Sequence, residues 1–258
     1  MTIKIFNQFK YSLIFLLILT SFNCYKPVAA QPKNQISRNA SKKKKPIRLK
    51  KKQQTGDKRG RPTRRRGMGN RNDCPTTDIP LTALIPEKQV GKVVEANPTF
   101  WLFIPYESSK IPKGEFVLQD ENHNDVYRRD FPINKGEGIV GVSLAYETSL
   151  KTNKIYQWYF KLYCKDSEST TPIYVQGWVQ RVALQPQQKQ QLSQLTSPRQ
   201  RATFYANNGI WYSAFTEIAK ICLSNHQNKS IAKDLSQLLS DVGLKDLSNK
   251  PIVGEISE

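Results

Sequence analysis

Few residues of this 258-residue chain have side chains suited to chemistry. It contains two histidines, His123 and His226, and four cysteines. Cys222 and His226 lie four residues apart and would share one face if a helix continued past Leu223, but no motif supplies the other ligands of a metal site. We therefore expect a buried cysteine and an exposed histidine. A Cys–His nucleophile pair is disfavoured because no third group is evident to orient the histidine.

The stretch from Asp120 to Asp125 begins like a calcium-binding loop, with oxygen ligands at alternate positions. The pattern departs from such a loop at its sixth position, where Asp125 replaces Gly, and at its twelfth, where Phe131 replaces Glu. We interpret the stretch as a polar hairpin loop, with weak calcium binding as the alternative.

The sequence contains no Gly-x-Ser-x-Gly elbow, no phosphate-binding glycine loop and no His-Glu-x-x-His helix. We therefore predict no catalytic residue, no metal and no cofactor, and a non-enzymatic protein is favoured. Paired carboxylates have no short sequence signature, so a glycan hydrolase that uses them stays an alternative.

The first 30 residues predict a signal peptide. Lys4 and Lys10 precede the apolar run from Leu13 to Leu19, and Val28-Ala29-Ala30 offers small residues for cleavage. The apolar run extends over about 12 residues, fewer than the roughly 20 needed to cross a bilayer. We expect export to the periplasm or the outside of the cell, with a retained anchor or lipidation at Cys24 as alternatives.

An oxidising compartment would allow two of the remaining cysteines to pair. We predict a disulfide between Cys74 and Cys164, because each lies at the edge of a predicted element whereas Cys222 lies on a helix far along the chain. Three free thiols are the alternative.

Charge is concentrated in residues 31–73, which contain 17 basic and 2 acidic residues, against 20 and 19 in residues 74–258. This segment has no aromatic residue and cannot bury enough apolar surface to offset its ordering entropy, so we predict a disordered tail. The candidate contacts to a polyanion, such as an acidic polysaccharide or lipid headgroups, are Lys42, Lys43, Lys44, Lys45, Lys50, Lys51, Lys52, Arg64, Arg65 and Arg66. A solvated linker is the alternative. Sequence-specific nucleic-acid binding is not expected without aromatic residues for stacking.

Residues 74–184 predict a β-sandwich domain. From Lys154 to Cys164, alternate residues Tyr156, Trp158, Phe160 and Leu162 share one face, which indicates a long central strand. The other expected strands are Lys92 to Ala96, Thr99 to Ile104, Glu115 to Gln119, Val126 to Phe131, Gly138 to Leu144 and Ile173 to Val182. Seven short strands separated by turn signals are typical of an immunoglobulin- or fibronectin-like sandwich.

Residues 185–258 predict a helical C-terminal region packed on the sandwich. Helices are expected over about Gln187 to Leu195, Arg199 to Asn207, Ile210 to Leu223 and Lys229 to Val242, with stops at Gly209 and Gly243. The third carries one apolar stripe that we expect to pack against its neighbours: Trp211, Phe215, Ile218, Ala219 and Cys222.

The sandwich has more aromatic residues than one face of each strand can bury, among them Trp101, Phe103, Tyr159 and Tyr163. One face belongs to the core. The other face is expected to lie beneath the helices, with a sugar- or peptide-binding surface as the alternative.

Several motifs in this order resemble a known family: Cys74-Pro75, Pro80-Leu81-Thr82-Ala83-Leu84-Ile85-Pro86, Pro98-Thr99-Phe100-Trp101-Leu102-Phe103-Ile104-Pro105-Tyr106, Tyr156-Gln157-Trp158-Tyr159-Phe160, Gly177-Trp178-Val179-Gln180-Arg181-Val182 and Tyr205-Ala206-Asn207-Asn208-Gly209-Ile210-Trp211-Tyr212. Over about residues 74–247, the chain resembles the cyanobacterial family known as domain of unknown function 928. The resemblance implies export in a cyanobacterium and supplies no activity. The basic tail lies outside it.

These observations favour an exported, non-enzymatic module that binds an unknown protein or glycan and is tethered to an anionic surface by its basic tail. The alternatives are an envelope glycan hydrolase with paired carboxylates and a scaffold for an extracytoplasmic protein assembly.

Overall fold

The computed structural model describes residues 45–50, 61–67, 74–87, 89–165, 171–225 and 228–256. The chain divides into two units, residues 1–42 and residues 43–258. Several features singled out from the sequence lie outside the described residues, namely the signal peptide, Lys42, Lys43, Lys44, Lys51, Lys52 and His226.

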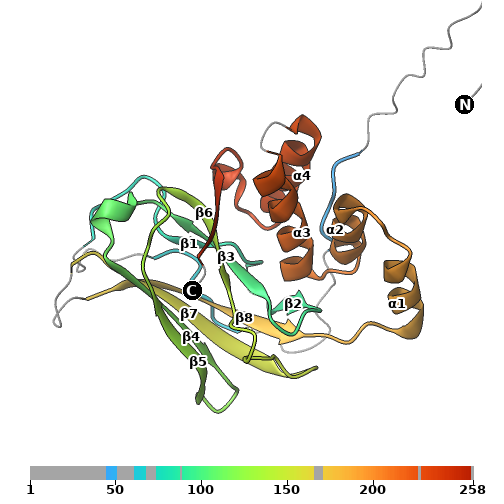
Figure 1. The fold of residues 1–258 in the computed structure, drawn as a ribbon, viewed down its shortest axis with the longest axis horizontal. Helices are drawn as coiled ribbons and strands as arrows, with labels where there is room; N and C mark the ends of the chain where they lie inside the picture. The colour runs from blue at the N-terminus through green and yellow to red at the C-terminus, as the bar shows by residue number, and fades with distance from the viewer. Residues whose placement is uncertain are drawn as a thin grey trace, which may run out of the picture. The chain divides into compact units, whose positions relative to one another are not determined.

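The described part of the second unit contains two β sheets (Figure 1). The first consists, in spatial order, of β1 (Thr82–Ala83), β3 (Thr99–Ile104), β6 (Gly138–Ser143) and β9 (Ile252–Ile256). The second consists of β2 (Gly91–Val93), β8 (Ile173–Arg181), β7 (Ile155–Tyr163), β4 (Lys113–Gln119) and β5 (Asp125–Phe131). Neighbouring strands are antiparallel except for the parallel pairs β2–β8 and β6–β9.

The two sheets pack face to face through aromatic side chains. Phe100 on β3 lies with its ring centroid 4.8 Å from that of Phe116 on β4 and 5.3 Å from that of Trp158 on β7. Tyr156, Trp158, Phe160 and Leu162 are all buried on the inner face of β7, as the alternation of the sequence predicted. The mainly β architecture with helices near the C-terminus is therefore confirmed.

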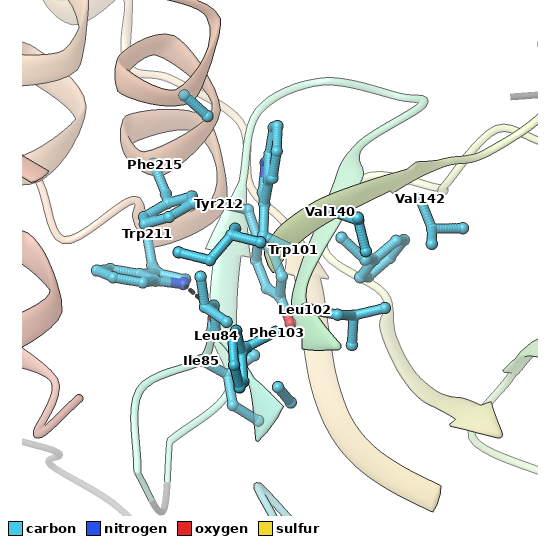
Figure 2. Close-up of a cluster of buried hydrophobic side chains, with 14 of the residues drawn as sticks. Leu84, Ile85, Trp101, Leu102, Phe103, Val140, Val142, Trp211, Tyr212 and Phe215 are labelled. Carbon is cyan, nitrogen blue, oxygen red and sulfur yellow. Dashed lines mark hydrogen bonds between the residues drawn. The ribbon is translucent and has the colours of Figure 1, made fainter. Parts of the chain in front are cut away.

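Strand β3 is buried on both faces, because all six of its residues are apolar or β-branched. Its second face meets the helices. The ring of Trp101 lies 5.7 Å from that of Phe215, and its indole Nε1 donates a hydrogen bond to Thr216 Oγ1 at 2.9 Å. Figure 2 shows this junction, where Trp211 also points to the loop after β1 and donates to the Leu84 carbonyl at 2.7 Å.

The predicted helices are present as α1 (Pro186–Ser193), α2 (Pro198–Asn207), α3 (Trp211–Ser224) and α4 (Lys229–Asp241), with short 3-10 turns at Ser108–Lys110 and Lys245–Leu247. Ser197 caps α2 by accepting from Gln200 N–H, and Pro198 occupies the first helical turn. Gly209 and Gly243 have φ of 69° and 77°, the left-handed conformation that favours glycine after a helix.

Tyr212 on α3 reaches into the space between the sheets. Its hydroxyl accepts a hydrogen bond from Trp158 Nε1 at 2.8 Å, and its ring lies 5.4 Å from that of Phe100. Gly91 on β2 leaves room for this ring, since a Cβ atom there would lie 2.3 Å from Tyr212 Cε2. Helix α3 is thus fixed to both sheets by one buried tyrosine.

Strand β1 and two further features of the fold were not predicted from the sequence. The C-terminal residues form β9, which pairs in parallel with β6 and so belongs to the sandwich and not to the helical region. Residues 45–50 and 61–67 pack on the domain, so the expectation of a disordered tail does not hold for them.

Residues 61–67 bridge the edges of both sheets. Arg64 exchanges two backbone hydrogen bonds with Gln176 on β8, of 3.2 and 2.9 Å. The Arg65 carbonyl accepts from Ala83 N–H on β1 at 2.7 Å, and Gly67 N–H donates to the Leu81 carbonyl at 2.7 Å. Backbone pairing to a sheet edge does not depend on apolar side chains, which explains how a basic segment can be ordered. The folded domain therefore begins before the predicted boundary at residue 74.

Candidate functional site

The structure contains the predicted disulfide between Cys74 and Cys164, with a Cα–Cα distance of 5.1 Å. It joins the segment before β1 to the residue that follows β7. Cys222 is free and half-buried on α3. Burial, reinforced by the charge of Asp234, raises the pKa of its thiol to about 11, so Cys222 is not an activated nucleophile.

The stretch from Asp120 to Asp125 forms the turn between β4 and β5 and the first residue of β5. The carboxylate of Asp120 accepts from the backbone N–H groups of Asn122 and Asn124 at 2.8 and 3.0 Å, and His123 has a positive φ of 64°. Asp125 is bonded to Gln119 and Arg128. These contacts form a polar hairpin loop, as predicted. Among the described residues, no group of three or more His, Cys, Asp or Glu side chains is arranged to hold a metal ion.

A pocket of about 540 Å³ lies between α1 and α2, and its lining contains no Asp or Glu: Gln191, Leu195, Ser197, Arg199, Gln200, Thr203, Phe204 and Asn207. It therefore does not supply the two carboxyl groups that a glycosidase needs.

The outer face of the five-stranded sheet is the strongest candidate for a binding surface. Helix α3 contacts β2, β3 and β9, so the helices lie against the other sheet and the β2 edge (Figure 1). The sequence predicted that the helices cover the second face of the strands. They cover Trp101 on β3, whereas Tyr159 and Tyr163 on β7 both remain half-exposed. The side chains of this outer face include Tyr159, Tyr163, Tyr174, Trp178, Lys113, Glu115, Arg128 and Lys161.

The aromatic rings of the outer face lie in two groups. Tyr159 and Tyr174 are neighbours on β7 and β8, with ring centroids 6.5 Å apart. At the far end of β7, Lys113 Nζ lies 5.2 Å from the centre of the Tyr163 ring. Desolvation by the surrounding side chains raises the pKa of both Tyr159 and Tyr163, so their hydroxyls are neutral donors at ordinary pH.

Glu115 organises the charged side chains at the centre of the outer face. One carboxylate oxygen accepts from Arg128, and the other accepts from Lys161 Nζ at 2.6 Å and from the Tyr163 hydroxyl at 3.2 Å. Burial by itself would raise the pKa of Glu115, but the hydrogen bonds from Lys161 and Arg128 outweigh it and lower the pKa. Glu115 is therefore ionised, which suits an orienting group and not a general acid, whose pKa must be raised.

Residues 61–64 cover the β8 side of the outer face. The Arg61 guanidinium lies 4.6 Å from the centre of the Trp178 ring, and the Arg64 guanidinium lies 4.2 Å from that of Tyr174. Trp178 Nε1 also donates to the Pro62 carbonyl at 2.8 Å. The basic segment thus forms one border of the aromatic surface.

The residues that the sequence predicted to contact a polyanion lie in surroundings that differ from one residue to another. Arg65 donates to the Gly243 carbonyl, and its burial lowers the pKa of its guanidinium. Arg66 forms an ion pair of 2.6 Å with Asp246. The backbone of residues 45–50 is docked on the helices, while Lys45 and Lys50 are exposed. The three arginines therefore act within the domain, and the two lysines remain available to solvent.

Sequence reasoning missed Glu115, Tyr174 and Trp178 as members of one surface. Alternation along β8 places Tyr174 and Trp178 on one face, but the side of the sheet that the helices leave uncovered follows from tertiary packing. Their position beside Tyr159 depends on the pairing of β7 with β8.

Comparison with known proteins agrees with the resemblance seen in the sequence. No curated protein matches the chain. The model of one family, described as Domain of Unknown Function (DUF928), matches residues 63–252, and this match includes Arg64 to Arg66, which the sequence had placed outside the family. The chain therefore belongs to the DUF928 family.

Proposed function

We propose that this protein is an exported, non-enzymatic binding module whose outer sheet face binds a glycan chain. The observation that carries this proposal is the half-exposed Tyr159 on a sheet face against which no helix of the described chain is found to pack, with Tyr174 beside it at the border formed by Arg64. Tyrosine rings that keep one face in water and one edge in the protein are typical of binding surfaces.

The chemistry of the outer face fits a sugar ring better than a strongly charged ligand. A flat aromatic ring contacts the C–H face of a pyranose, while neighbouring polar groups bond its hydroxyls. Most cations of the face are already neutralised, since Lys113 pairs with Asp130, Lys161 pairs with Glu115, and Arg128 pairs with both Glu115 and Asp125. The surface is therefore amphipathic and nearly balanced in charge, which favours neutral or weakly acidic glycans.

The second part of the proposal is that the basic residues of the tail bind an anionic surface. Lys45 and Lys50 are exposed, and Lys42 to Lys44 and Lys51 to Lys52 adjoin them in the sequence. Such a cluster attracts anionic polysaccharide or lipid headgroups by counterion release, with an affinity that falls as salt rises. The domain would then be held near the envelope while its outer face is free to bind.

Export is supported by the N-terminal signal pattern and by the disulfide, since disulfides persist in oxidising compartments. Of the helices in the described ranges, none combines the length and the apolar character needed to span a membrane.

Affinity electrophoresis through gels containing neutral or uronic-acid polysaccharides tests the glycan site. We expect at least one polysaccharide to retard the wild-type protein, and Tyr159→Ala or Tyr174→Ala to abolish the retardation. The control is Tyr146→Ala, since Tyr146 is 89% exposed and lies in the loop after β6. Equal retardation of all four proteins would show that the outer face is not the glycan-binding site.

Vesicle sedimentation tests the tail. Replacement of Lys42–Lys45 and Lys50–Lys52 by glutamine is expected to abolish salt-sensitive binding to vesicles that contain anionic lipid, whereas replacement by arginine preserves it. Binding that survives the glutamine variant would show that the tail is not the tether.

A further inference from the structure

Residues 45–50 lie in an extended conformation between α2 and α4, shown in blue beside α2 in Figure 1. Ile47 is 2% exposed and belongs to the hydrophobic core, whereas the neighbouring Arg48 side chain is 73% exposed. Leu49 packs partly against the same core. The segment therefore alternates between buried and exposed side chains, as a peptide bound in a groove does.

The backbone of this segment is hydrogen-bonded at three positions. Ile47 N–H donates to Asp234 at 3.0 Å, Leu49 N–H donates to Asp241 at 2.8 Å, and Lys50 N–H donates to the Ala206 carbonyl at 2.9 Å. Acceptors on two different helices thus hold three amides of an extended chain, which fixes its direction and register.

Asp234 is the centre of this docking site. Its carboxylate is 1% exposed and accepts from Arg199 Nε at 2.6 Å and from Arg199 Nη2 at 3.0 Å. Arg199 also donates to the Lys45 carbonyl at 2.9 Å. A buried carboxylate on α4 and a guanidinium on α2 therefore both use part of their bonding capacity on the segment, so the site is built for a peptide and not only for contact between the two helices.

We infer that the α2–α4 groove is a peptide-docking site that accepts residues 45–50 of a second copy of this chain when its own segment has left. The contacts that hold the segment within one molecule are the backbone bonds, the buried Ile47 side chain and the ion pair of 3.8 Å between Arg48 and Asp241. Every copy carries the same residues, so an exchanged segment makes the same contacts.

Competition decides which segment fills the groove. A segment tethered to its own domain acts at an effective concentration on the order of millimolar. The segment of a second copy therefore docks only when that concentration is matched locally or when the chain's own segment is disabled. Exchange of this segment therefore joins two copies through the same contacts that hold the segment within one molecule.

Complementation between two full-length variants tests the inference. Ile47→Glu disables the segment but keeps the groove, and Asp234→Ala disables the groove but keeps the segment. We expect each variant alone to be monomeric by light scattering after size-exclusion chromatography, and an equimolar mixture to form a dimer. A mixture that stays monomeric at a concentration of about 100 µM would overturn the inference.

A labelled peptide of residues 43–52 supplies a second measurement. We expect it to bind full-length Ile47→Glu at least tenfold more tightly than it binds the wild-type chain, whose own segment competes. Peptide Ile47→Ala should bind at least tenfold more weakly, because a buried side chain is truncated, while peptide Arg48→Ala should change the affinity less than threefold. Equal affinities of these two peptides would indicate simple charge attraction and refute a specific groove.

If Ile47→Glu does not unfold cooperatively and is therefore not properly folded, hydrogen exchange on the wild-type chain tests the inference instead. The amides of Ile47, Leu49 and Lys50 are expected to exchange at least a hundredfold more slowly than in the free peptide. Exchange at the free-peptide rate would show that the segment is not docked, and the inference would fail.

Discussion

Removal of the Tyr212 hydroxyl tests how α3 is fixed to the sandwich. Tyr212 is 1% exposed and Trp158 is fully buried, and the bond from Trp158 Nε1 to the Tyr212 hydroxyl measures 2.8 Å. Burial, only partly offset by this hydrogen bond, raises the pKa of Tyr212, so the hydroxyl is neutral and the substitution removes no charge. Tyr212→Phe keeps the ring and leaves a buried indole N–H without its acceptor.

The expected cost follows from the energetics of buried hydrogen bonds. An unsatisfied buried donor costs about 1–3 kcal/mol, and the loss of the tyrosine hydroxyl recovers part of this because one polar group fewer is buried. We therefore expect the free energy of unfolding to fall by about 1–2 kcal/mol. For a domain of this size this corresponds to a decrease in Tm of about 2–8 °C.

Urea unfolding followed by tryptophan fluorescence, without reductant, measures this change. The dependence of the free energy on urea should keep its slope, since the surface exposed on unfolding is the same. Tyr146→Phe, at an 89% exposed position, is the matched control and should not change the stability. A Tyr212→Phe variant as stable as the control would refute the role of this bond.

A double-mutant cycle separates the bond from other effects of the substitution. With Trp158→Phe as background, the donor is absent and Tyr212→Phe should cost about 1 kcal/mol less than in the wild type. Additive effects of the two substitutions would show that the two side chains are not coupled.

Three further predictions concern the disulfide, the contact of Gly91 with the Tyr212 ring, and the charge of Glu115. Replacement of Cys74 and Cys164 by serine opens a loop with a sequence separation of 90 residues and should lower the stability by up to about 4–5 kcal/mol in urea unfolding, and a loss below about 1 kcal/mol would contradict the loop-entropy argument. Gly91→Ala places a Cβ atom against the Tyr212 ring and should cost about 1–3 kcal/mol, whereas Gly136→Ala, with nothing within 4 Å, should cost far less; equal Tm values for the two variants would argue against the close contact. The lowered pKa of Glu115 stabilises the fold at pH values above about 4.5, the value expected of the unfolded chain, and this stabilisation is lost as the pH falls through the folded-state pKa. Glu115→Gln should therefore lower Tm at pH 7 and have less effect at pH 3, and an equal effect at both would show that the charge of Glu115 does not contribute.

Local patterns predicted much of the fold. Alternation from Tyr156 to Leu162 identified the inner face of β7, and the apolar stripe of α3 identified four buried residues of that helix, Trp211, Phe215, Ile218 and Ala219. Gly209 and Gly243 marked the ends of helices because the left-handed conformation there favours glycine. These features depend on residues close in sequence, so local reasoning was sufficient.

The position of the basic segments could not be predicted in the same way. Composition argued for disorder, yet Arg64 pairs with β8 through backbone atoms, and Ile47 occupies a groove between two helices more than 150 residues further along the chain. Neither contact has a local signature, because each depends on a surface formed by residues distant in sequence. The pairing of β9 with β6 is missed for the same reason.

The sequence by itself determined most elements of this protein: its strands from β2 to β8, its four α-helices, its family and the cysteines available to pair. Tertiary structure decided which faces of those elements are covered. The tyrosines of β7 were visible in the sequence from the start, but α3 packs on β3 and leaves the Tyr159 face without a helix. Burial on one side of a strand is set by its alternation, whereas burial on the other side depends on where distant elements pack. The candidate binding surface therefore emerges only from the packed molecule.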